Sequence, residues 1–139
     1  MPESLLFSQE KKKLLEQCQT IAIVGLSNNP SRASNRIGKY LQSQGYIIVP
    51  VNPNLEEVLG EKCYPDLQAI PFKIDLVDVF RRSEEVYAIV NAAREMNIPA
   101  VSTQSGVYCD DESIKLAQDN KITLVENACI MVEHKLLIG

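Results

Sequence analysis

Short apolar runs recur along the chain and are separated by longer, more polar segments. The runs cover residues 20–25, 46–51, 74–80, 99–103 and 122–125. The first, Thr20-Ile-Ala-Ile-Val-Gly25, is apolar throughout its middle, a pattern typical of a strand buried on both faces of a parallel sheet. Each run is therefore interpreted as a strand.

The segments between these strands have the apolar spacing and the end signals of helices. The first predicted helix covers residues 8–18, with Ser8 as its cap. The second carries Ile37, Tyr40 and Leu41 and ends at Gly45. Three more helices are predicted from Ser83 to about 96, from 110 or 111 to about 120, and over 129–137. Short helical turns are expected near 55–59 and 66–70.

This alternation of strands and helices predicts an α/β fold. Strands joined through helices become parallel neighbours by right-handed crossovers. Residues 1–139 are therefore expected to form a single doubly wound, Rossmann-like domain with a five-stranded, mainly parallel sheet. Because such sheets bind ligands at the carboxyl ends of their strands, we expect a site in the loops after Gly25, Val51, Phe80 and Thr103.

Composition narrows the functional classes. The chain has 139 residues, 45% of them hydrophobic and 23% charged, which fits one folded domain. A net charge of −4 disfavours broad nucleic-acid binding but permits a local basic pocket. No apolar run approaches the roughly 20 residues of a membrane span, and the first residues do not read as a signal peptide. The four cysteines lack metal spacing, so we expect a cytoplasmic protein with reduced thiols.

The loop after the first strand has the features of a phosphate site. Gly25 allows a sharp turn, and the helix that follows offers free N–H groups and the positive end of its dipole. Arg32, Arg36 and Lys39 add positive charge. The dinucleotide fingerprint G-x-G-x-x-G is absent, because Ser27 stands where the second glycine would be. The alternative is an ordinary loop with solvated cations.

The loops after the next strands add further candidates. Asn52 and Pro53 stand where NAD proteins place an acid for the ribose hydroxyls, so the site suits a nucleotide with an extra ribose phosphate, such as coenzyme A (CoA) or NADP. Phe80 can contact a flat or apolar group. Arg81 and Arg82 can bind a phosphate, or they can pair on the surface with Glu84 or Glu85. After the fourth strand, Gln104 can donate to a ligand or serve as a polar loop residue.

Catalytic groups are scarce. Cys129 and the single histidine, His134, lie five residues apart, about 140° around a helix, so they are not expected to face each other. We interpret Cys129 as a structural cysteine and place His134 at the surface or in the last helical turn. Asp75 and Asp78 lie three residues apart in a predicted strand and point to opposite faces. No catalytic centre and no metal site are expected.

Several motifs, in this order, resemble the small stand-alone CoA-binding domain family. The matching segments are Val24-Gly-Leu-Ser-Asn-Asn-Pro30, Lys39-Tyr-Leu41, Gly45-Tyr46, Val49-Pro-Val-Asn-Pro53, Leu59-Gly-Glu-Lys-Cys-Tyr-Pro65, Val77-Asp-Val-Phe-Arg-Arg82 and Cys129-Ile-Met-Val-Glu-His134. The resemblance runs from about residue 19 to 137. It implies a Rossmann-like fold similar to the CoA-binding domain of the succinyl-CoA synthetase α subunit.

The resemblance also implies a cofactor, CoA or an acyl-CoA, and roles for particular residues. The residues it assigns are Gly25, Ser27, Pro30 and Arg32 in the pyrophosphate loop, Asn52 and Pro53 after the second strand, Phe80, Arg81 and Arg82 after the third, and Gln104 near the pantetheine arm. The chain departs from the family pattern before Gln104, where Ser102 and Thr103 stand in place of a pair that is often aromatic or bulky, and at Ala128, where relatives often carry an arginine.

Three functions follow as hypotheses. The first is a CoA-binding module without a catalytic centre of its own. The second is an NADP-dependent oxidoreductase, for which Tyr108 and Lys39 are the candidate proton donors. The third is a thiol-redox regulator in which Cys129 forms a mixed disulfide with CoA. Pairing into a homodimer is compatible with a domain of this kind, and no protein partner is indicated.

Overall fold

The computed structural model describes residues 3–139, with side chains described from Gln9 onward, and it is built around one five-stranded sheet. The strands are β1 (Thr20–Val24), β2 (Ile47–Val51), β5 (Leu76–Val79), β6 (Ala100–Thr103) and β7 (Thr123–Val125). They pair in the order β2-β1-β5-β6-β7, and every pairing is parallel. The chain winds outward from β1 to β2 and then in the opposite direction from β5 to β7. The predicted doubly wound, Rossmann-like fold is confirmed, with its switch point between β1 and β5.

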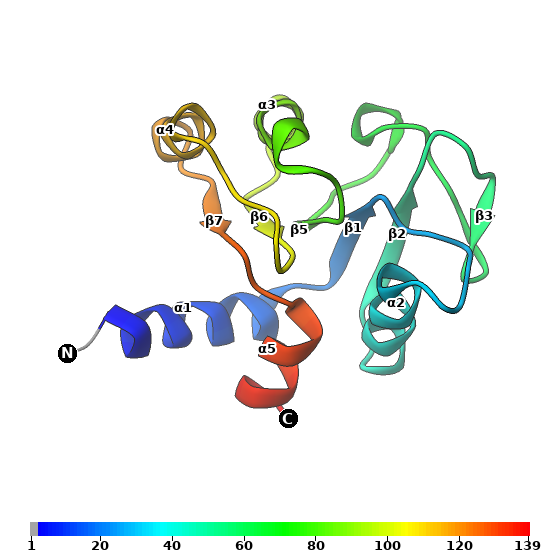
Figure 1. Ribbon diagram of the computed structural model, residues 1–139, viewed down its shortest axis with the longest axis horizontal. Coiled ribbons are helices and arrows are strands. Elements are labelled where there is room, and N and C mark those ends of the chain that lie inside the picture. The colour runs from blue at the N-terminus through cyan, green and yellow to red at the C-terminus, as the bar shows by residue number, and fades with distance from the viewer. Residues whose placement is uncertain (1–2) are drawn as a thin grey trace.

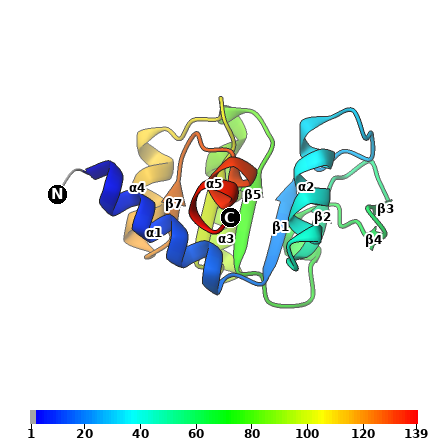
Figure 2. The same ribbon diagram turned by 90° about the horizontal axis from the view of Figure 1, so that it is seen from below.

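Helices cover both faces of the sheet. On one face lie α1 (Glu3–Gln17), α2 (Ala33–Ser43) and α5 (Ile130–Leu137), and on the other lie α3 (Val86–Glu95) and α4 (Asp111–Asp119) (Figure 1). Figure 2 shows the first of these faces, with α1, α5 and α2 in front of the strands. None of the helices within residues 3–139 is long and apolar enough to cross a bilayer.

The core has two halves, one on each face of the sheet. On the α1 side, Ile23 and Leu76 pack with Leu15, Leu41 and Ile130 from the three helices. On the α3 side, the buried residues come from alternate strand positions and from the inner face of α3, among them Val77, Val79, Val101, Val86, Val90 and Ala93. This alternation explains why the strand sequences are apolar at nearly every position.

The stretch between β2 and β5 differs in part from its prediction. A turn of 3-10 helix, η1 (Leu67–Ala69), confirms the helical turn expected near 66–70. The helical turn expected at 55–59 is wrong, because β3 (Glu57–Val58) and β4 (Glu61–Lys62) form an antiparallel hairpin there. Leu59 and Gly60 make its two-residue turn with φ values of 55° and 79°. The Leu59 side chain lies against Gly38 of α2, a tertiary contact that the local sequence does not reveal.

Two helix starts also differ from their predictions. α1 already begins at Glu3, so Ser8 lies within the helix rather than at its cap. Ser83 opens a short 3-10 turn, η2 (Ser83–Glu85), and α3 follows from Val86. The Ser83 hydroxyl does not cap a helix, because it accepts a hydrogen bond from the Tyr108 N–H at 2.9 Å. The predicted start of α4 is confirmed, with the Asp110 side chain accepting from the Ser113 N–H.

The two aspartates near β5 occupy different surroundings. The Asp75 carboxylate accepts the backbone N–H groups of Gln19 and Thr20, both at 3.0 Å, and so ties the starts of β1 and β5 together. Asp78 lies inside β5 and is fully buried, and neither of its carboxylate oxygens has a hydrogen-bond partner. Burial raises the pKa of Asp78 well above its usual value, so the folded protein favours the neutral acid.

Candidate functional site

Two cavities adjoin at the carboxyl ends of the strands. Cavity 1 has a volume of about 690 Å³ and is lined by Ala33, Ile37, Phe80, Arg81, Arg82, Glu85, Gln104, Ser105, Gly106, Val107 and Cys129. Cavity 2 has a volume of about 450 Å³ and is lined by Val24, Gly25, Val51, Pro53, Pro65, Asp66, Leu67, Gln68, Arg81, Glu84, Glu85, Ala88, Ile89 and Ala92. Both volumes lie in the range of small-molecule sites. Arg81 and Glu85 line both cavities and therefore stand at the boundary between them.

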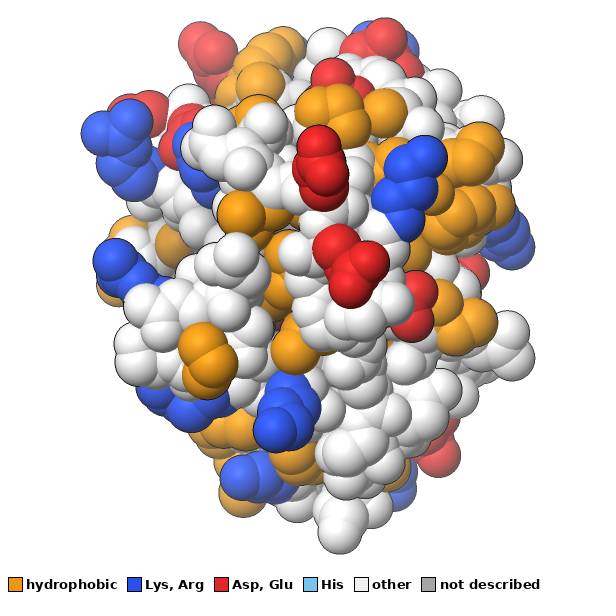
Figure 3. Space-filling model, turned by 90° about the vertical axis from the view of Figure 1, so that its right-hand side faces the viewer, with side chains coloured by type: hydrophobic (Ala, Val, Ile, Leu, Met, Phe, Trp, Pro, Cys, Tyr) orange, Lys and Arg blue, Asp and Glu red, His pale blue; other side chains and the backbone are white. Residues whose placement is uncertain are grey.

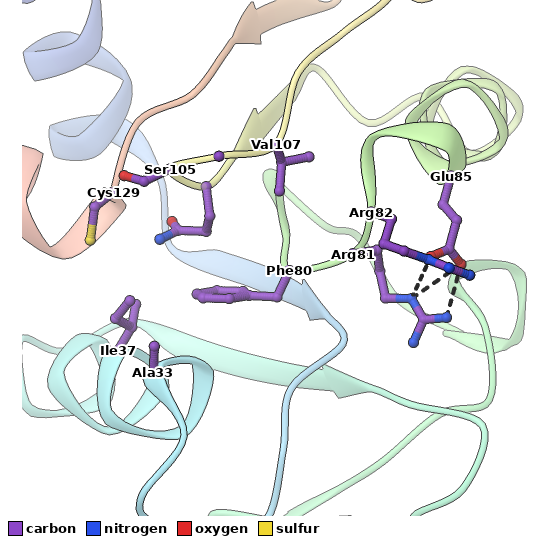
Figure 4. A pocket seen from close by; sticks show the side chains of 11 residues that line it. Ala33, Ile37, Phe80, Arg81, Arg82, Glu85, Ser105, Val107 and Cys129 are labelled. Carbon is purple, nitrogen blue, oxygen red and sulfur yellow. Dashed lines mark hydrogen bonds and ion pairs between the residues drawn. The ribbon is translucent and has the colours of Figure 1, made fainter.

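Cavity 1 has an apolar end and a charged end (Figure 4). The Phe80 ring points toward Ile37 and Cys129, whereas the Arg81 side chain points the other way, toward Glu85. This arrangement follows from the end of β5, where consecutive residues face in opposite directions. An elongated ligand with one apolar and one anionic part therefore matches this cavity.

Gly25 is required by the geometry at the end of β1. Its φ is +91°, and a Cβ at this position would lie 2.5 Å from the Phe80 carbonyl oxygen and 3.0 Å from Arg81 Cδ. The Gly25 N–H donates to the Val51 carbonyl at 2.8 Å. The chain at the end of β1 passes so close to Phe80 and Arg81 that only glycine fits there.

Uncharged hydrogen bonds brace the loop after Gly25. Ser34 Oγ accepts from the Ser27 N–H at 3.0 Å, and the Asn35 side-chain amide donates to the Ser27 carbonyl at 2.8 Å. From the neighbouring loop, the Asn52 side-chain amide donates to the Leu26 carbonyl at 3.2 Å. These contacts hold the loop in place before any ligand arrives.

The N-terminus of α2 fits an anion. Its N-cap residue, Arg32, forms no side-chain cap, and the first turn of α2 contains no acid. Free N–H groups and an uncompensated dipole end favour a negative group there. Arg36 donates to the Ser31 carbonyl at 2.7 Å, while Arg32 and Lys39 are exposed and form no ion pair with the side chains that the structure describes.

The arginines after β5 form the expected ion pairs with Glu84 and Glu85, and both also line a cavity. Arg81 binds Glu85 through Nη2–Oε1 at 2.8 Å and through Nε at 3.2 Å to each carboxylate oxygen, and it also lines both cavities. Hydrogen bonds from Arg81 lower the pKa of Glu85. Arg82 is 81% exposed and lies 3.9 Å from Glu84 and from Glu85, so its ion pairs are loose.

Gln104 is fixed at the wall of cavity 1. Its Oε1 accepts from the Ile130 N–H at 3.1 Å, and the residue is buried. Since the amide oxygen is already bonded to α5, the side-chain NH₂ is the group that Gln104 can offer to a ligand.

The predicted site residues divide into those that line a cavity and those that do not. Phe80, Arg81, Arg82 and Gln104 line cavity 1, and Gly25, Pro53 and Arg81 line cavity 2. Ser27 and Asn52 line neither cavity and support the loop instead, while Pro30 and Arg32 are exposed on it.

Three acidic residues reach the site: Asp66, which the sequence analysis did not single out, and Glu84 and Glu85, which it named only as surface partners of the arginines. The chain has no acid at positions 52 and 53, but Asp66, Glu84 and Glu85 reach cavity 2 from η1 and η2. Glu84 and Glu85 both had a local signal, because they follow Arg81 and Arg82 closely enough to pair with them, whereas Asp66 had none.

Cys129 and His134 only partly match their expected surroundings, since His134 lies in the last turn of α5, one of its two expected places, but is not at the surface. Cys129 is half-buried and lines the apolar end of cavity 1, so its position borders the candidate site. His134 is buried rather than exposed, and its Nδ1 shares a hydrogen bond of 2.7 Å with the Tyr40 hydroxyl. Burial lowers the pKa of His134. The imidazole therefore joins α5 to α2 and is engaged with Tyr40 rather than with a thiol.

Comparison with known proteins identifies the family to which this site belongs. A family model described as the CoA binding domain matches residues 19–135. The chain belongs to the CoA binding domain family. The protein YneT of Bacillus subtilis (strain 168) is 37% identical to this chain over 125 residues, which cover 90% of this chain and 92% of YneT.

Two further relatives show how the CoA binding domain occurs. A solved structure of a hypothetical protein from Pyrococcus horikoshii OT3 matches with a TM-score of 0.93 and 37% identity, covering 100% of this chain and 97% of that one. Acetate–CoA ligase (ADP-forming) I of Archaeoglobus fulgidus is 34% identical over 121 residues, which cover 81% of this chain but 18% of the ligase. The domain therefore occurs both in short chains and as a small part of a larger enzyme.

Proposed function

We propose that this protein binds CoA or an acyl-CoA across the carboxyl ends of β1 and β5, as a cofactor-holding module without a catalytic centre of its own. The observation that carries the proposal is the pair of adjoining cavities at the switch point, with Arg81 between them. Membership of the CoA binding domain family and the similarity to an acetate–CoA ligase support CoA as the ligand.

The shape and chemistry of the two cavities suit the parts of CoA in one order. The adenosine end fits cavity 2, between Pro53 and Leu67, and the pantetheine arm fits the apolar end of cavity 1 beside Phe80 and Gln104. The diphosphate between them then lies near Arg81 and the N-terminus of α2, where the Gly25 turn leaves room. Ser27, Pro30, Arg32 and Asn52 shape or border this loop, and Arg82 adds a solvated charge.

The NADP-dependent alternative receives less support. Neither Tyr108 nor Lys39, its candidate proton donors, lines either cavity.

Thermal unfolding of the purified protein with equal concentrations of CoA, dephospho-CoA, NADP, NAD and ATP tests the proposal. A ligand that binds only the folded state raises the Tm. We expect CoA to give the largest rise. A rise with NADP and none with CoA would contradict the proposal and favour the oxidoreductase.

One observation favours a second candidate function, thiol exchange with CoA. Cys129 lines the apolar end of cavity 1, where the arm that ends in the CoA thiol is proposed to lie. In this reaction the Cys129 thiolate attacks one sulfur of CoA disulfide, a mixed disulfide forms, and the second CoA leaves as its thiolate.

Intact mass after incubation with CoA disulfide checks this exchange. We expect the protein to gain the mass of one CoA and to lose it on reduction. Cys129→Ser should abolish the gain, and the matched Cys109→Ser should not, because Cys109 lines neither cavity and burial raises its pKa to about 11. An unmodified wild-type protein would rule the exchange out.

A further inference from the structure

Glu85 occupies an unusual position for an acidic residue in a site that is proposed to bind a diphosphate. Arg81 Nη2 and Nε both donate to its carboxylate, at 2.8 and 3.2 Å, so the carboxylate takes one whole edge of the guanidinium. The two side chains are 40% and 34% exposed and both line both cavities. A ligand that extends from one cavity into the other therefore passes the carboxylate as well as the guanidinium.

The arginine itself is held by a second contact that does not involve Glu85. Arg81 Cδ lies 3.0 Å from the point where a Cβ of Gly25 would be, so the aliphatic stem rests on the end of β1. The stem therefore stays beside the phosphate position when the Glu85 contact is exchanged. The pair is half-exposed, and pairs of this kind add little to stability, so the exchange costs little.

The charges around the pair oppose an anion in the free protein. Cavity 2 is lined by the acids Asp66, Glu84 and Glu85 and by one cation, Arg81. Cavity 1 adds Arg82, which is largely exposed. A carboxylate that only oriented Arg81 would lie behind it, away from the ligand, whereas the Glu85 carboxylate faces both cavities.

We propose that Glu85 is an internal counter-ion that occupies Arg81 in the free protein and is displaced from it by the diphosphate of the ligand. The inference rests on the proposed function for the identity of that ligand. It makes Glu85 a specificity-determining residue, since displacement requires a group that binds the guanidinium more strongly than a carboxylate does. A diphosphate meets this requirement, and an uncharged ligand gains nothing from Arg81.

Isothermal titration with CoA, in the wild type and in two variants of equal charge, tests this role. Glu85→Gln removes the counter-ion and keeps the shape of the side chain. Glu84→Gln is the matched control, because it removes the same charge one residue away. The Glu84 side chain is 77% exposed and lies near Arg82 rather than Arg81. We expect Glu85→Gln to bind CoA about two- to fivefold more tightly than Glu84→Gln does, as expected when one half-exposed ion pair no longer competes with the ligand.

The outcomes separate this inference from the proposed function. Wild-type protein that binds no CoA overturns the proposed function, and the inference falls with it. Wild-type protein that binds CoA, with Glu85→Gln equal to or weaker than Glu84→Gln, overturns the counter-ion role alone. Pantetheine, which has no phosphate, should bind both variants equally, and a gain in its affinity for Glu85→Gln also contradicts the inference. If Glu85→Gln unfolds, Glu85→Ala provides the same comparison.

Discussion

The loops that follow β1 and β5 border the same site, but they are stabilised in different ways. The loop after β1 is braced by uncharged groups, chiefly Ser34, Asn35 and Asn52. The loop after β5 holds its arginines through ion pairs, the closest of them between Arg81 and Glu85. An anion can approach the first loop without breaking a contact, whereas at the second it has to replace one. In the proposed binding mode, the first loop therefore gives the site its shape, and the second controls its response to charge.

The strands that precede these loops also differ in their polar content. β1 is apolar across its buried centre, whereas β5 carries Asp78 directly opposite Ile23. The Asp78 carboxyl has no hydrogen-bond partner among the described residues, and burying an unpaired polar group costs free energy that the apolar centre of β1 does not.

The largest effect is expected from Gly25→Ala, which breaks the shape of the first loop. The new Cβ would meet the Phe80 carbonyl oxygen at 2.5 Å in a backbone with φ of +91°. We expect the free energy of unfolding to fall by about 2–4 kcal/mol in urea titrations. Gly45→Ala is the control, because Gly45 has φ of +94° but nothing within 4 Å of a Cβ. An equal loss in both variants would show that the contact with Phe80 is unimportant.

Asp78→Asn tests how much stability the buried carboxyl in β5 costs. The raised pKa means that the folded protein keeps a proton on Asp78 after the unfolded chain has lost it. The free energy of unfolding of the wild type therefore falls as the pH rises above the usual pKa of 3.8, by about 1.4 kcal/mol per pH unit until the folded pKa is reached. The asparagine variant lacks this loss and should be the more stable protein at pH 7.

Urea titrations of both proteins from pH 4 to pH 7 measure this difference. Asp75→Asn should instead destabilise the protein, because Asp75 accepts two backbone N–H groups. A constant difference between Asp78→Asn and the wild type across this range would contradict the raised pKa.

Arg81→Gln and Arg82→Gln compare the two cations of the second loop. Arg81 lines both cavities and is held close to Gly25, so its loss should weaken CoA binding by about 1.5–3 kcal/mol, as expected for a hydrogen bond to a charged group. Arg82 is 81% exposed, and its loss should cost less than about 1 kcal/mol. Calorimetric titration with CoA measures both, and equal losses would reject the assignment of Arg81 as the main cation.

A smaller effect on stability than that of Gly25→Ala is expected from Ser34→Ala. This variant removes the acceptor for the Ser27 N–H and should lower the free energy of unfolding by about 1 kcal/mol. Ser43→Ala is a suitable control, because Ser43 is an exposed serine at the other end of α2. If Ser34→Ala is no more harmful than Ser43→Ala in urea titrations, the first loop does not depend on this hydrogen bond.

Much of the fold could be predicted because its signals are local. The five strands are apolar runs that need burial on both faces, and the helices between them force a parallel arrangement. The hairpin at 57–62 could not be predicted in this way, since Leu59 adopts its positive φ where its side chain packs on Gly38 of α2. The start of α3 was misplaced for a similar reason, because the Ser83 hydroxyl bonds to Tyr108.

The candidate site was predictable to a similar degree. Its cations and its glycine follow strand ends, and that rule located Gly25, Phe80, Arg81 and Gln104 at the cavities. The rule does not say which acids reach a cavity, and so it missed Asp66 and placed Glu84 and Glu85 only on the surface.

By itself the sequence determined the α/β class, the edge of the sheet that carries the site, and the residue types that stand there, because periodicity and strand-end loops are local properties of the chain. Only the tertiary structure decided that two cavities adjoin at Arg81, that Glu85 shares that boundary, and that Cys129 borders the apolar end. These facts depend on the packing of α2, α3 and α5 around the strand ends. Such contacts join residues far apart in the chain, and no local pattern encodes their distances.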